Sequence, residues 1–85
     1  MKIQVTQEDI DWSYLRIMYG KHRFYACPVG GALRRQGYPR SGASESFLYL
    51  DFDGIKTVRT TDTVREFMRA YDSGKEVHPF SFEIP

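Results

Sequence analysis

The clearest pattern of apolar and polar positions lies in the second half of the chain. Residues 47–52 and 55–60 are two apolar-rich runs separated by Asp53-Gly54, a dipeptide that favours a tight β-hairpin. The expected cross-strand pairs are Tyr49 with Val58, Phe52 with Ile55, and Asp51 with Lys56, the last of them a favourable charge pair. This stretch therefore predicts an antiparallel hairpin.

A helical pattern follows the hairpin. Apolar side chains recur at positions i, i+3, i+4 and i+7 over residues 61–73, with charged residues between them facing outward, and Gly74 ends the run. Phe80, Phe82 and Ile84 then alternate with polar residues, which predicts a closing strand beginning at Pro79. The expected core contains Leu50, Phe67, Met68, Phe80 and Phe82.

The first half of the chain is less regular. Ile3 and Val5 alternate with polar neighbours and predict a short strand. Thr6 can then cap a helix whose first turn carries two acids, where the helix dipole favours negative charge.

Two structures fit residues 13–27. Helical spacing links Ile10, Tyr14, Ile17 and Met18 as far as Gly20. Alternatively, "YLRIMY" and "HRFYAC" form two β-rich runs joined by Gly20-Lys21 as a hairpin turn. We favour a short helix followed by this hairpin.

The middle of the chain predicts another helix. Pro28 suits a first helical position and Gly37 a stop, while Val29, Ala32 and Leu33 share one face. The Gly30-Gly31 pair lowers helix propensity but permits close packing. Residues 38–46 are rich in turn formers and predict an exposed loop.

These elements predict one compact α+β domain over residues 1–85, since a chain of this length has room for a single small core. We expect a small antiparallel sheet with a central β-hairpin, packed against two or three short helices. The helix at 61–73 is expected to cover one face of that sheet.

The distribution of charge adds a functional clue that the net charge of +1 hides. Residues 12–44 carry six bases and no carboxylate, whereas residues 1–11 carry one base and three acids, and residues 45–85 carry five bases and eight acids. Such asymmetry argues for association with a partner. The expected partner-binding residues are Arg16, Tyr19, Lys21, Arg23, Tyr25, Arg34, Arg35, Tyr38 and Arg40.

Candidate catalytic chemistry is sparse. Cys27 is the only cysteine, which excludes an internal disulfide framework and a four-cysteine zinc site and favours a reducing compartment. A helix N-terminus can activate a thiol, with His22 or His78 as a base, but a lone cysteine heading a helix is more often a small buried hydrophobe.

Binding sites for metals, nucleotides and membranes also lack support. "DFDG" is explained by its turn and has no following calcium-ligand pattern, and no glycine-rich loop has phosphate-binding spacing. No apolar run approaches the roughly 20 residues of a membrane span. We expect no enzyme activity, no cofactor, no metal, no small-molecule substrate and no membrane partner.

Three segments together resemble a broad family of small phage and prophage proteins: "VTQEDID", "CPVGGALRR" and "YDSGKEVHPFSFEIP". In that family a strand and a T-x-x-x-I helix precede a cysteine-headed, alanine-rich helix, followed by a hairpin, a helix ending in D-x-G and a P-F-x-F strand. Here Gly30 and Gly31 replace other small residues, and "WSYLRIMYGKHRFY" is longer and more aromatic. The family has no assigned chemistry, so the resemblance implies a phage origin and a host-cytoplasm setting but no site residues.

Two functions suit a basic and aromatic surface. Tyr, Trp and Arg are enriched at interface hot spots, so the first is binding and blocking of a host protein or nucleoprotein complex, for example as an anti-CRISPR-like inhibitor of host defence. The alternative is an accessory protein that binds single-stranded DNA or RNA, with aromatic rings stacking on bases and cations neutralising phosphates. The aromatic residues that stand among the six bases are Trp12, Tyr14, Tyr19, Phe24, Tyr25 and Tyr38.

Overall fold

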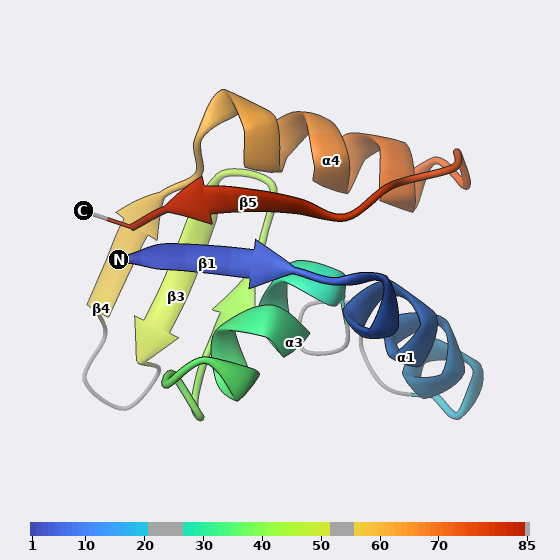
Figure 1. The fold of residues 1–85 in the computed structure, drawn as a ribbon, viewed down its shortest axis with the longest axis horizontal. Helices are drawn as coiled ribbons and strands as arrows, with labels where there is room; N and C mark the ends of the chain where they lie inside the picture. Colours follow the sequence, from blue (N-terminus) through green and yellow to red (C-terminus); the bar gives the residue numbers. More distant parts are fainter. Residues whose placement is uncertain (21–26, 52–55, 85) are drawn as a thin grey trace.

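The computed structural model describes residues 1–20, 27–51 and 56–84, and these residues form three helices and two antiparallel sheets (Figure 1). The helices are α1 (Gln7–Met18), α3 (Pro28–Arg35) and α4 (Asp62–Asp72). The strands are β1 (Lys2–Val5), β2 (Gly42–Ala43), β3 (Phe47–Asp51), β4 (Lys56–Arg59) and β5 (Phe80–Glu83). The predicted α+β class is confirmed.

The strands form two sheets where the sequence pattern suggested one. β1 pairs with β5, and a separate three-stranded sheet has the order β2-β3-β4. Figure 1 shows β1 and β5 side by side between α4 and α3, with β3 and β4 at the left of the molecule. The closing strand predicted from its alternating pattern therefore completes a sheet with the N-terminal strand.

The hairpin register is correct at one predicted pair and shifted at another. Asp51 lies opposite Lys56 as expected, but Tyr49 pairs with Thr57, and Val58 lies opposite Leu48. The ladder has an irregularity between Tyr49 and Asp51, and such a bulge changes the pairing by one residue. The predicted Phe52–Ile55 pair and the Asp53-Gly54 turn lie outside the described residues.

Helix α1 begins at the predicted cap. The Thr6 hydroxyl accepts a hydrogen bond from the Asp9 backbone N–H, and the Asp9 carboxylate accepts one from the Thr6 N–H. The helix runs to Met18, so the alternative that treated "YLRIMY" as a strand is wrong. Gly20 follows with a φ of +86°, and the hairpin predicted beyond it extends into residues that the structure does not describe.

Helix α3 also begins and ends as predicted. Pro28 occupies its first turn, and Gly37 follows its end with a φ of +117°, a conformation that glycine adopts without strain. The helix packs against α1, β1 and β2.

The exposed loop predicted over residues 38–46 is wrong for Ser41, Gly42 and Ala43, which are buried. Gly42 and Ala43 form β2 and pair with β3, and the Ser41 carbonyl accepts a hydrogen bond from Arg34 on α3. Small side chains let this segment lie close to α3, so residues typical of a turn here fill a narrow buried space.

Aromatic packing joins α4 to the rest of the molecule. Leu50, Phe67, Met68 and Phe82 are buried as predicted, and Phe80 packs against them while partly exposed. The Phe67 ring lies 4.5 Å from the Phe80 ring on β5 and stacks on Tyr71 at 6.3 Å. The Tyr71 hydroxyl lies 2.7 Å from the Ser13 hydroxyl, which links α4 to α1 in the core.

Candidate interaction surface

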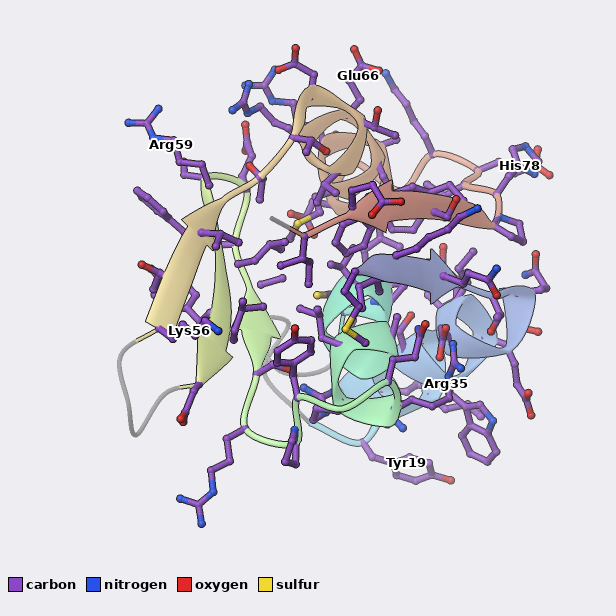
Figure 2. The ribbon with its side chains drawn as sticks, turned by 60° about the vertical axis from the view of Figure 1, so that its left-hand side comes forward. Tyr19, Arg35, Lys56, Arg59, Glu66 and His78 are labelled. Atoms are coloured by element: carbon purple, nitrogen blue, oxygen red, sulfur yellow. The ribbon has the colours of Figure 1, made fainter. Side chains whose placement is uncertain are left out.

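Helix α1 carries large apolar side chains on the side that faces away from the core. Ile10 and Ser13 are buried on its inner side. On the outer side Trp12 is 52% exposed, Leu15 42%, Met18 78% and Tyr19, directly after the helix, 86%. We call these four residues the α1 face. Figure 2 shows Tyr19 at the margin of the molecule.

The spacing of the α1 face explains why it points outward. Trp12, Leu15 and Tyr19 stand at i, i+3 and i+7, which places them on one side of the helix, opposite Ile10 and Ile17. A surface helix normally has one apolar side, and an apolar second side marks a place where another molecule packs. Within residues 1–20, 27–51 and 56–84, the hydrophobic core does not include any of the four side chains of the α1 face.

Arg16 lies beside the α1 face at the junction of α1 with α3. A Cβ atom placed on Gly31 would stand 3.2 Å from the Arg16 Nη1 atom, so the missing side chain of Gly31 makes room for this guanidinium. Burial lowers the pKa of Arg34 on α3, and the nearby charge of Arg16 lowers it further. Two like charges therefore lie near one another at this junction.

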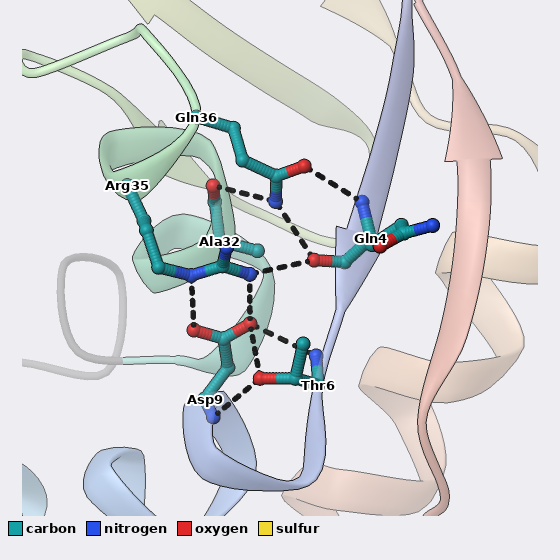
Figure 3. Close-up of polar contacts among 6 residues, drawn as sticks. All are labelled: Gln4, Thr6, Asp9, Ala32, Arg35 and Gln36. Carbon is teal, nitrogen blue, oxygen red and sulfur yellow. Dashed lines mark hydrogen bonds and ion pairs between the residues drawn. The ribbon is translucent and has the colours of Figure 1, made fainter.

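Arg35 has a role inside the fold that the sequence did not indicate (Figure 3). Its Nε and Nη2 atoms donate to the two Asp9 carboxylate oxygens at 3.3 and 2.9 Å, and Nη2 also donates to the Gln4 carbonyl at 3.0 Å. The Asp9 side chain is only 9% exposed. Arg35 therefore ties α3 to both α1 and β1, which makes it a structural residue.

The environment of Asp9 favours its charged form. Burial by itself raises the pKa of this carboxyl, but hydrogen bonds from Arg35 and Thr6, together with the Arg35 charge, outweigh burial and hold the pKa below its ordinary value. The hydrogen bond to Asp9 in turn raises the pKa of Arg35.

Gln36 completes this network, and no pattern in the sequence pointed to it. Its side-chain Oε1 accepts from the Gln4 backbone N–H at 3.1 Å, and its Nε2 donates to the Gln4 carbonyl at 2.8 Å (Figure 3). The same Nε2 donates to the Ala32 carbonyl at 3.1 Å. One side chain thus satisfies both backbone groups of a residue in β1.

Tyr38 and Arg40 lie in a different part of the molecule, next to the three-stranded sheet. Tyr38 is half-buried against the core, and its hydroxyl donates to the Met1 sulfur at 3.6 Å. Tyr38 and Arg40 line a shallow hollow with residues of β3 and the start of β4, Lys56 among them.

The six predicted partner-binding residues that the structure describes lie in three places. Arg16 and Tyr19 lie at the α1 face, while Arg34 and Arg35 are engaged by neighbouring segments and Tyr38 and Arg40 border the sheet. The remaining three, Lys21, Arg23 and Tyr25, lie outside the described residues.

Cys27 caps α3 from a buried position. Its Sγ atom accepts a hydrogen bond from the Gly30 backbone N–H at 3.4 Å, and the residue is almost fully shielded from solvent. Burial raises the pKa of the thiol, which disfavours the reactive thiolate.

We expect the Cys27 thiol of the folded protein to resist Ellman's reagent at pH 8 and to react completely in concentrated guanidinium, because reaction requires an accessible thiolate. Absorbance at the thionitrobenzoate band measures the extent of reaction, and the unfolded protein serves as the control. Fast stoichiometric labelling of the folded protein would contradict the buried position.

Comparison of the chain with family models, with curated proteins and with solved structures gave no match in any of the three. In the described ranges, none of the helices combines the length and apolarity needed to cross a membrane. Within the same residues, no three His, Cys, Asp or Glu side chains come together in a way that could hold a metal ion.

Proposed function

We propose that this protein binds another protein through the α1 face and blocks it, without catalysing a reaction. The observation that carries the proposal is the exposure of four large apolar side chains on one side of a single helix. Exposed apolar area is unfavourable in water, at about 25 cal/mol for each Å², and burial against a partner recovers that free energy. Tyr, Trp and Met are also enriched at protein interfaces.

The spacing and charge of this surface indicate what the partner offers. Trp12, Leu15 and Tyr19 follow the i, i+3, i+7 spacing with which a helix enters an apolar groove. Arg16 adds a positive charge at one border, while the exposed carboxylate of Asp11 lies one turn before Leu15 on the same side of the helix. The matching partner surface is therefore an apolar groove with charges of both signs around it.

The resemblance to phage proteins supplies the setting of the proposal. A protein of this kind acts in the cytoplasm of an infected bacterium, and its partner is a host protein or nucleoprotein complex. A component of a host defence system, as in anti-CRISPR inhibition, is the specific form that we propose.

The test combines partner capture with a variant confined to the α1 face. The immobilised protein is used to capture partners from a bacterial lysate, and the captured protein is then purified and titrated by calorimetry. The triple variant Leu15→Gln, Met18→Gln, Tyr19→Gln should bind at least about a hundredfold more weakly, because several interface anchors are lost at once. Its melting temperature should match the parent, since all three side chains are exposed.

Phe47→Thr is the matched control, because it removes an exposed aromatic ring from the three-stranded sheet and leaves α1 unchanged. It should bind the captured protein as the parent does. Equal affinity of the parent and the triple variant would refute the proposal. A parent dimer that the triple variant dissolves, seen by light scattering, would instead assign the α1 face to self-association.

A further inference from the structure

The fold gives the three methionines of the chain very different exposure to solvent. The Met68 side chain on α4 is only 6% exposed and belongs to the hydrophobic core. Met18, the last residue of α1, is 78% exposed, and Met1 is 58% exposed. A dissolved oxidant reaches a thioether where the side chain contacts solvent, so the fold protects one methionine and leaves two accessible.

The two accessible methionines lie in different parts of the molecule. Met1 exchanges backbone hydrogen bonds with Ile84, and its sulfur accepts one from the Tyr38 hydroxyl at 3.6 Å. Met18 belongs to the α1 face, directly before Tyr19, which Figure 2 shows at the margin of the molecule. Only Met18 therefore places an oxidisable sulfur in the proposed binding surface.

We infer that Met18 is a site of reversible oxidation, and that its conversion to the sulfoxide by hydrogen peroxide weakens the binding of a partner to the α1 face. In this reaction the thioether sulfur supplies two electrons to the peroxide, and an S–O bond forms as the O–O bond breaks. The other peroxide oxygen leaves as hydroxide and takes the proton of the transferred oxygen, which gives water. The inference rests on the proposed function and adds a form of regulation to it.

Oxidation changes what Met18 can do at an interface. An unbranched thioether adapts its shape to an apolar groove, which is why methionine is common at binding surfaces. The sulfoxide oxygen is a polar acceptor, and its burial in an apolar groove without a donor is unfavourable. The fold itself should tolerate the change, because the Met18 side chain already lies in solvent.

The first measurement locates the oxidised residue. The folded protein is treated with hydrogen peroxide, and mass spectrometry of its peptides gives the sulfoxide fraction at each methionine over time. Met18 should be oxidised while Met68 remains a thioether, and both should react in concentrated guanidinium, where the core is open. The melting temperature, measured by circular dichroism, should stay near that of the untreated protein.

The second measurement reports the α1 face without a partner. Retention on a phenyl resin depends on exposed apolar surface, so the oxidised protein should elute earlier than the untreated protein. The matched control is Met18→Leu, which keeps an apolar side chain at this position and leaves Met1 and Met68 available to the oxidant. Peroxide treatment should change the retention of this variant much less than that of the parent.

The third measurement is calorimetric titration against the captured and purified partner. Oxidation should weaken binding by the parent at least about tenfold, because an interface anchor becomes polar. The loss should follow the sulfoxide fraction at Met18, and the two methionine sulfoxide reductases, one for each epimer, should restore the affinity. Met18→Leu should bind within about threefold of the parent before and after treatment.

Two results would overturn this inference and leave the proposed function standing. One is an oxidised parent that binds the partner like the untreated protein, while the α1 triple variant binds weakly. The other is an equal loss of retention or affinity in Met18→Leu on treatment, which would place the sensitive sulfur elsewhere. Equal affinity of the parent and the triple variant would overturn the proposed function and this inference together.

Discussion

Replacing Phe67 with alanine is expected to lower the free energy of unfolding by about 3–5 kcal/mol, which is enough to unfold most of a domain of this size. Phe67 is buried on α4, and its ring contacts those of Phe80 and Tyr71. Removal of the ring leaves a cavity at the point where α4 meets β5. The helix would then lose its main contact with the closing strand.

Thermal unfolding followed by circular dichroism measures this effect. Phe67→Leu keeps most of the apolar volume and should cost less than Phe67→Ala. Glu66→Ala is the control on the same helix, because Glu66 is exposed and points away from the molecule (Figure 2), and it should melt within a few degrees of the parent. A Phe67→Ala protein that melts like the parent would show that the aromatic contacts do not hold α4 in place.

Reversing the charge of Arg35 is expected to destabilise the fold by about 2–3 kcal/mol, since hydrogen bonds to charged groups contribute about 1.5–3 kcal/mol. Arg35→Glu removes the bonds to Asp9 and Gln4 and places a second carboxylate beside the shielded Asp9. Charge reversal at an exposed base that only contacts a partner would leave the melting temperature nearly unchanged, so this variant tests the structural role of the ion pair with Asp9.

Urea unfolding at pH 7 measures the effect of Arg35→Glu, and Lys75→Glu, at an exposed position, is the control for charge reversal. The dependence of the free energy of unfolding on pH provides a second measurement. Because the folded pKa of Asp9 is depressed, its contribution is complete above the unfolded carboxyl pKa of about 4 and is lost as pH falls through the lower folded value. The loss of stability between pH 7 and pH 3 should therefore be smaller in Arg35→Glu. An equal acid-dependent loss in both proteins would argue against the ion pair.

Local signals predicted the ends of elements well. Thr6 caps α1, Pro28 lies in the first turn of α3 and Gly37 follows it, because each of these features depends on the backbone within a few residues. Long-range pairings were not predictable in this way. The register that places Lys2 opposite Glu83 depends on how the two ends of the chain meet in the folded core.

For the candidate interaction surface, too, the sequence predicted local features but not long-range contacts. An excess of bases in residues 12–44 directed attention to the segment that contains Arg16 and Tyr19, but composition does not reveal that Arg35 is paired with a carboxylate near the N-terminus. The apolar outward side of α1 could have been predicted from the i, i+3, i+7 spacing of Trp12, Leu15 and Tyr19.

The Gln36 side chain affects whether the edge of β1 can pair with a strand of another molecule. In the pairing of β1 with β5, the backbone groups of Gln4 point away from β5, so they lie on the open margin of a two-stranded sheet. The unpaired N–H and C=O groups of such an edge strand can pair with an extended segment of another molecule, and this pairing can start aggregation. The side-chain amide of Gln36 has a donor and an acceptor arranged as in a peptide group. It therefore makes the two hydrogen bonds to Gln4 that a neighbouring strand would otherwise make. At Gln4, the edge of β1 is thus occupied by a side chain, at a position where many proteins use a charged residue or a proline.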